Sequence, residues 1–127
     1  MNRLLFVLLS LVGFSLLSGC GGPGAGDSCG GRDFVCQDDA QALECRGGKW
    51  RALACRGPLG CRELADSVRC DTSLNQENDA CAQDAEGKGV CSPNGGTALL
   101  TCQQGVLVKT ADCSSCSVQE GQVICQP

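Results

Sequence analysis

Residues 42–55 read ALECRGGKWRALAC, two short segments around the turn Arg46-Gly47-Gly48-Lys49. Glycine adopts positive φ without a steric penalty, and tight hairpin turns require that backbone conformation. Residues 99–113, LLTCQQGVLVKTADC, have the same layout around Gln103-Gln104-Gly105, followed by the β-prone Val106-Leu107-Val108. The two stretches therefore predict two β-hairpins.

The cysteines around these hairpins indicate a tandem duplication. Twelve follow Cys20 and fall into two sets of six: Cys29, Cys36, Cys45, Cys55, Cys61 and Cys70, then Cys81, Cys91, Cys102, Cys113, Cys116 and Cys125. Residues at equal offsets from matching cysteines also agree, as in the pairs Asp27/Asp79, Val35/Val90, Leu43/Leu100, Gly48/Gly105 and Val68/Val123. Agreement in both spacing and flanking residues favours two copies of one module.

Each copy is expected to add a third strand before its last cysteine, at Ser67-Val68-Arg69-Cys70 and Gln122-Val123-Ile124-Cys125. Residues 61–70, CRELADSVRC, could instead begin as one helical turn. Side chains alternate along a strand, so Leu43 shares a face with Cys45. The predicted fold is a small disulfide-rich, mainly β protein with two tandem six-cysteine modules, each a short hairpin plus a third strand.

The expected boundaries follow from the cysteine sets. Module 1 covers residues 27–71 and module 2 covers residues 79–127. Between them, residues 72–78 (TSLNQEN) lack cysteine and are mostly polar, which is typical of a linker.

The composition explains why so many cysteines are needed. The chain has no Tyr and one Trp, and Phe34 is the one Phe after residue 20. Small domains with few large apolar side chains are usually cross-linked, and each disulfide contributes about 2–4 kcal/mol. Twelve cysteines in an exported chain predict six disulfides, and their pairing stays open among fifteen possibilities per module.

The first twenty residues have the layout of an export signal: a basic start at 1–3, an apolar stretch at 4–17 and a small-residue exit. As a helix the apolar stretch would span about 21 Å, against about 30 Å for a bilayer core. No basic cluster follows it, because residues 21–26 carry no charge. We therefore expect a cleaved signal and no permanent transmembrane anchor.

The end of this segment, Leu17-Ser18-Gly19-Cys20, resembles the lipobox of bacterial lipoproteins. The resemblance implies removal of residues 1–19, acylation of Cys20 (diacylglyceryl on its thiol, palmitate-type acylation of its new amino terminus) and a membrane anchor. Cys20 then has no free sulfur, which leaves an even twelve cysteines. In that family Asp after the acylated Cys tends to retain the protein at the inner membrane, so Gly21 implies the outer membrane, facing the periplasm or the cell surface. The Gly-rich residues 20–26 would be a short flexible tether.

The wider cysteine pattern resembles small cysteine-repeat lipoproteins of gliding soil bacteria. Loss of Arg3 with the signal leaves nine basic and fourteen acidic residues, a formal charge of −5. An acidic balance disfavours nucleic acid as a partner. The expected partners are the membrane, through the lipid anchor, and an unidentified envelope or extracellular molecule.

Catalysis is not expected. The chain contains no His, which excludes Ser-His-Asp and Cys-His arrangements. The acidic pairs Asp38/Asp39 and Glu63/Asp66 are interpreted as solvated loop residues. Cys113-Ser114-Ser115-Cys116 has the CxxC spacing of redox and zinc sites, but the matching Cys55 and Cys61 have five residues between them, which favours structural disulfides. No cofactor or metal is predicted.

The preferred hypothesis is therefore a lipid-anchored envelope protein with a non-catalytic binding or structural role. Two alternatives remain open. Trp50 on the first hairpin could stack on a sugar, as aromatic residues do in chitin-binding modules, which the six-cysteine layout loosely resembles. Arg56, in the short loop between Cys55 and Cys61, could be presented to a trypsin-like serine protease as an inhibitor residue.

Overall fold

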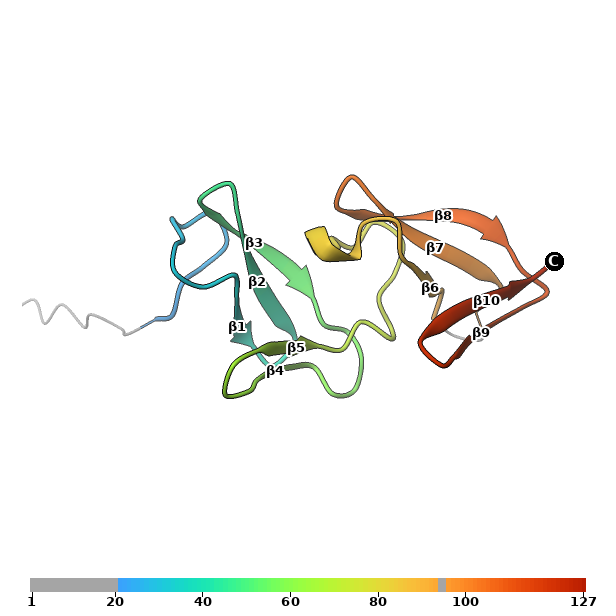
Figure 1. Ribbon diagram of the computed structural model, residues 1–127, viewed down its shortest axis with the longest axis horizontal. Coiled ribbons are helices and arrows are strands. Elements are labelled where there is room, and N and C mark those ends of the chain that lie inside the picture. The colour runs from blue at the N-terminus through green and yellow to red at the C-terminus, as the bar shows by residue number, and fades with distance from the viewer. Residues whose placement is uncertain (1–20, 94–95) are drawn as a thin grey trace, which may run out of the picture.

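The structure, a computed structural model, describes residues 21–93 and 96–127 and confirms a small disulfide-rich β fold (Figure 1). Strands and one 3₁₀ turn, η1, account for the regular structure of these residues, with no α-helix among them. In chain order the elements are β1 (Phe34–Asp38), β2 (Gln41–Arg46), β3 (Lys49–Ala54), β4 (Cys61–Glu63), β5 (Val68–Cys70), η1 (Gln83–Ala85), β6 (Gly89–Cys91), β7 (Ala98–Gln103), β8 (Val106–Asp112), β9 (Ser115–Gln119) and β10 (Gln122–Gln126).

Module 1 is a three-stranded antiparallel sheet with a two-stranded ribbon beside it. The predicted hairpin is present as β2 and β3, joined by Gly47 and Gly48, whose φ angles are 59° and 76°. Positive φ at both turn residues is the two-residue hairpin geometry that matches the natural strand twist. β1 pairs with the free edge of β2, and β4 pairs with β5 as the ribbon.

Module 2 repeats this arrangement strand for strand. β7 and β8 form the hairpin, β6 pairs with β7, and β9 and β10 form the ribbon. Its turn residues Gln104 and Gly105 also have positive φ, 51° and 77°. Even the isolated bridge that joins each module's first residues to its hairpin recurs, as Ser28 with Lys49 and Ala80 with Val106. The figure shows the two modules side by side, with both hairpin turns on the same side of the molecule (Figure 1).

The six disulfides have the same connectivity in both modules. In each, the first cysteine pairs with the third, the second with the fifth and the fourth with the sixth. The pairs are Cys29–Cys45, Cys36–Cys61 and Cys55–Cys70, then Cys81–Cys102, Cys91–Cys116 and Cys113–Cys125. The first bond ties the entry segment to the hairpin, and the second ties the sheet to the ribbon.

Alternation along β2 gives the first sheet two buried faces. Leu43, at 0% exposure, packs with Val35 and Trp50 on one face. Ala42 packs with Leu53 and two half-cystines on the other. In module 2 the position of Leu43 is taken by Leu100 and that of Trp50 by Leu107, and both are buried.

The predicted hairpins and third strands are confirmed, but each module contains more strand than expected. Residues 61–63 form strand β4 and not the helical turn that was the alternative, because Cys61 pairs directly with Cys70 across the ribbon. β1, β6 and β9 were not predicted. β1 and β6 are short and are extended because they pair with the hairpin of their own module.

The described residues include no helix long and apolar enough to cross a membrane. Residues 1–20, which carry the expected signal and the Cys20 lipidation site, lie outside the described residues.

The shared connectivity generates a first prediction. Peptide mapping without reduction should recover the six linked pairs given above and leave no free thiol among these twelve cysteines. Removing the fourth-to-sixth bond with the double variant C55S/C70S should lower the free energy of unfolding by about 2–4 kcal/mol, measured by urea denaturation. The matched variant C113S/C125S should show a similar decrease in the free energy of unfolding, because Cys113–Cys125 is the corresponding bond of module 2 and closes a loop of similar length. A linked peptide joining the two modules would contradict the structure.

Candidate binding cavity between the two modules

The two modules meet across the second face of the first sheet. Ala80 and Ala82, at the start of module 2, pack against the cluster that contains Ala42, Leu53 and Cys55. Because these side chains are small, the modules approach closely without filling the space between them. The face that in a single module would be open to water is thereby covered by the next module.

Polar contacts hold the modules in register at one end of this junction. Glu44, only 4% exposed, accepts a hydrogen bond from the backbone N–H of Gln83 at 2.7 Å. Its second carboxylate oxygen, Oε2, is buried and has no hydrogen-bond partner. The guanidinium of Arg51 donates to the carbonyl oxygen of Gly105, in the turn of the second hairpin. A side chain at Gly105 would displace this guanidinium, and the φ of 77° there favours glycine in any case.

An ion pair crosses the other end of the junction. Arg56 donates to Asp79 from Nε at 2.7 Å and from Nη2 at 2.9 Å. The Asp79 side chain is 10% exposed and also accepts from the backbone N–H of Gln76. The hydrogen bond from Arg56 is the main reason that the pKa of Asp79 lies below its ordinary value, and burial opposes that shift.

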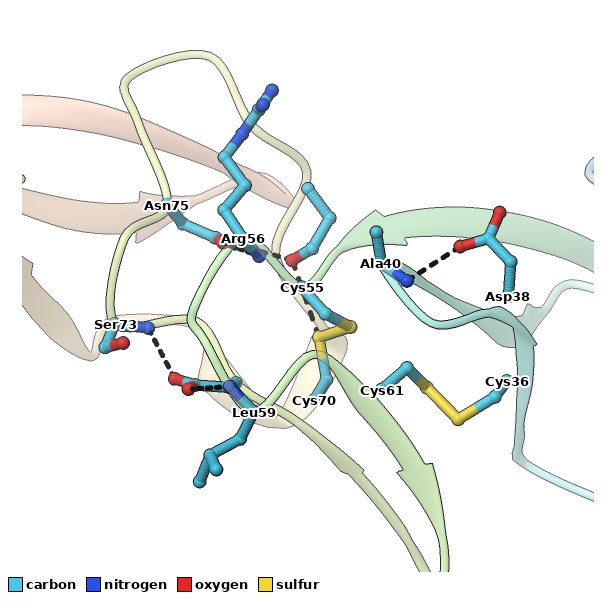
Figure 2. Close-up of a disulfide and its surroundings, with 12 residues drawn as sticks. Cys36, Asp38, Ala40, Cys55, Arg56, Leu59, Cys61, Cys70, Ser73 and Asn75 are labelled. Carbon is cyan, nitrogen blue, oxygen red and sulfur yellow. Dashed lines mark hydrogen bonds between the residues drawn. A yellow bond between two sulfur atoms is a disulfide. The ribbon is translucent and has the colours of Figure 1, made fainter.

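The connecting segment 72–78 contributes a buried side chain. Asn75 is 2% exposed, although its neighbours are mostly exposed. Its Oδ1 accepts from the backbone N–H of Arg56 at 3.1 Å, and its Nδ2 donates to the carbonyl oxygen of Ala54 at 2.8 Å. Figure 2 shows Asn75 beside Arg56 and above the Cys55–Cys70 disulfide. The segment predicted as a linker is thus packed against module 1 at this residue.

Between these contacts lies a cavity of about 270 Å³. Module 1 lines it with Phe34, Ala42, Leu53 and Val68, and module 2 with apolar residues that include Ala85, Val90 and Leu107. Asn75, Asp84 and Lys88 are among the polar residues of the lining. An apolar pocket with a few polar groups is the usual form of a small-molecule site, so this cavity is the candidate functional site.

Trp50, the predicted sugar-stacking residue, lies elsewhere. It is 7% exposed and packs on Val35 and Leu43, beside Cys29 and Cys45. Sugar stacking needs an open aromatic face, and this geometry does not favour that role.

Arg56, the predicted inhibitor residue, lies at the junction in its ion pair with Asp79. The loop that follows it is a tight turn in which the Gly60 N–H donates to the Gly57 carbonyl oxygen. The Asp71 carboxylate accepts from the backbone N–H groups of Leu59 and Ser73 and closes the loop (Figure 2). The Arg56 side chain is 48% exposed, but its guanidinium is paired with Asp79, whereas a protease inhibitor would present an unpaired one.

The CxxC residues do not bond to each other. Cys113 pairs with Cys125, and Cys116 pairs with Cys91. Across residues 21–93 and 96–127, no three His, Cys, Asp or Glu side chains gather as a metal site would require.

The polar residues that line the cavity were not predicted from the sequence. Asn75 stands in a polar, cysteine-free segment and has the appearance of a solvated linker residue. Asp84 and Lys88 resemble ordinary surface charges. One signal was present: module 2 begins with the unusually small Ala80-Cys81-Ala82, which suits close packing.

No protein-family model matches the chain, no curated protein matches its sequence, and no solved structure matches it. What the protein does is therefore inferred from its own residues and geometry.

Glu44 supplies a prediction about the junction. Glu44→Ala leaves the N–H of Gln83 without its acceptor and opens a gap at a buried position, so it should lower the free energy of unfolding by about 1–3 kcal/mol. Glu44→Gln keeps a carbonyl oxygen for Gln83 and removes a carboxylate oxygen that has no partner, so it should cost much less. Urea denaturation of both variants makes the comparison. Equal losses would show that the hydrogen bond to Gln83 is not what matters.

Asp79 supplies a prediction about acid. Because the pKa of folded Asp79 lies below its ordinary value of 3.8, its stabilising effect is complete above that pH and is lost as the pH falls toward the folded-state pKa. Asp79→Asn should therefore be less stable than the wild type near neutral pH, and the difference should shrink as the pH falls below 3.8.

The control for this measurement is internal. The pKa of Asp71 is also lowered, chiefly by its hydrogen bond from the Leu59 N–H, and this contribution is present in both proteins. Thermal unfolding from about pH 7 to about pH 2 then isolates the Arg56–Asp79 pair as the difference between the two curves. A difference that does not change with pH would contradict the assignment.

Proposed function

We propose that the protein is a lipid-anchored envelope protein whose two modules act together as one non-catalytic binding head. The observation that carries the proposal is the apolar cavity at their junction, which is built from residues of both modules. Neither module alone has both walls of the cavity, so the binding site would exist only in the duplicated chain.

The junction is suited to hold such a site. Glu44, Arg51 and the Arg56–Asp79 pair fix one module on the other, and Asn75 holds the connecting segment on module 1. Apolar side chains and half-cystines make up most of the lining. This composition suits binding, and the absence of histidine from the chain removes the commonest general base.

The anchor places the head at a membrane. The lipobox-like Leu17-Ser18-Gly19-Cys20 supports acylation of Cys20, and Gly21 after it supports the outer membrane. Two or more acyl chains give stable attachment, whereas a single chain gives marginal binding. Because the Gly26 N–H donates to the Trp50 carbonyl oxygen of module 1, the free tether is at most residues 20–25, and it would keep the module close to the lipid headgroups. The partners proposed are the membrane itself and a molecule of the envelope or its surroundings.

Replacement of the proposed lipidation site tests the anchor. Cys20→Ser should abolish incorporation of labelled palmitate and leave an uncleaved precursor, because no thiol remains to receive the diacylglyceryl group. Ser18→Ala is the matched control, since it keeps a small residue before Gly19 and should be processed normally. Fatty-acid labelling and the mass of the membrane-bound protein give the result. Normal maturation of Cys20→Ser would overturn the lipoprotein proposal.

A further inference from the structure

We propose that the cavity between the modules binds a small, uncharged, mainly apolar molecule that carries one hydrogen-bonding group, such as a hydroxyl or a carbonyl. This inference rests on the proposed function only in taking the junction as the binding site, and it does not depend on the lipid anchor.

The walls of the cavity determine the body of the ligand. Phe34, Leu53 and Val68 face it from module 1, and Ala85, Val90 and Leu107 from module 2. These side chains offer dispersion contacts and no hydrogen bonds, so they favour an aliphatic or aromatic group that leaves water to enter the site.

The volume limits the size of the ligand. A cavity of about 270 Å³ is larger than the engineered cavities of about 150 Å³ that admit benzene, and it lies just below the range of drug-sized sites. A molecule on the order of ten non-hydrogen atoms fits between these limits.

Asn75 accounts for the single polar group. A carboxamide can donate two hydrogen bonds and accept two. In the protein Asn75 uses one of each, to the Ala54 carbonyl oxygen and from the Arg56 N–H. Asn75 belongs to the cavity lining and is 2% exposed, so only a small part of it faces the cavity, and its one unused N–H and one unused lone pair are the polar capacity we assign to a ligand. A hydroxyl or a carbonyl can use this remaining capacity.

Asp84 and Lys88 explain why the ligand is uncharged. Both belong to the lining, and neither forms a salt bridge with any residue that the structure describes. An anion is attracted by Lys88 but repelled by Asp84, and a cation meets the opposite pair of effects. The two charges therefore give no net preference for either sign, while apolar walls penalise any charged group that loses its water.

Four probes with one ring in common test the ligand class: benzyl alcohol, toluene, benzoate and benzylamine. The soluble chain of residues 21–127 is titrated with each while its backbone amide signals are followed by NMR. Benzyl alcohol should give saturable shifts centred on Ala82, Val90 and Leu107. Toluene should bind about five- to tenfold more weakly, because it offers no partner to the N–H and lone pair of Asn75 that the protein leaves unused. Benzoate and benzylamine should both bind more weakly than benzyl alcohol.

Two variants locate the site. Ala85→Phe fills the cavity from module 2 and should remove the saturable shifts. Ala65→Phe adds the same ring to an exposed loop that does not line the cavity, so it should leave binding of benzyl alcohol unchanged. If Ala85→Phe does not fold, nuclear Overhauser effects between the probe ring and the methyl groups of Leu53 and Leu107 in the wild-type protein decide the location without a variant.

The possible outcomes separate the two proposals. The absence of saturable binding by benzyl alcohol would overturn the inference, as would binding unaffected by a folded Ala85→Phe or a missing Overhauser effect to both leucines. Tighter binding of benzoate or benzylamine would overturn the claim that the ligand is uncharged. None of these results touches the lipid anchor, which fails only if Cys20→Ser matures normally.

Discussion

The fold depends on one constraint: a chain with few large apolar side chains is held together by overlapping disulfide loops. Among the described residues, five of the twelve buried apolar positions are half-cystines and a sixth is the small Ala42. Trp50 is the one buried aromatic side chain in this set. In each module the loop closed by the first pair overlaps that of the second, which overlaps that of the third. The sheet and the ribbon are thereby fixed to each other covalently, and packing has only to fill the space between them.

The duplication is symmetric in its scaffold and asymmetric in its surface. Module 1 holds module 2 through Glu44, Arg51 and Arg56. The positions that correspond in module 2, counted from its matching cysteines, carry Thr101, Val108 and Ser114. Module 2 therefore lacks the carboxylate and both guanidinium groups with which a further copy would be bound in the same manner. The two copies therefore differ at the junction. Module 1 supplies the charged side chains that bind module 2, and module 2 covers the apolar face of module 1.

Local features of the fold could be predicted from the sequence, and features that need distant partners could not. Gly47-Gly48 and Gln104-Gly105 identify their hairpins because the required positive φ is a property of the turn itself. The match of Leu43 with Leu100 locates equivalent core positions. The pairing of the cysteines was left open, because six of them in a module allow fifteen arrangements whose choice depends on tertiary contacts. The burial of Asn75 was missed for the same reason, since its partners Ala54 and Arg56 lie some twenty residues earlier.

All six disulfides lie within a module, and this has a mechanical consequence if the protein is anchored as proposed. If a partner pulls on module 2 while the tether holds module 1, overlapping covalent loops keep each module from extending. The ten residues between Cys70 and Cys81 are held by hydrogen bonds alone and by no disulfide, and fully extended they span about 35 Å. Tension would therefore part the junction, and empty its cavity, before it unfolded either module. For a protein anchored and occupied as proposed, load on module 2 and occupancy of the cavity would oppose each other.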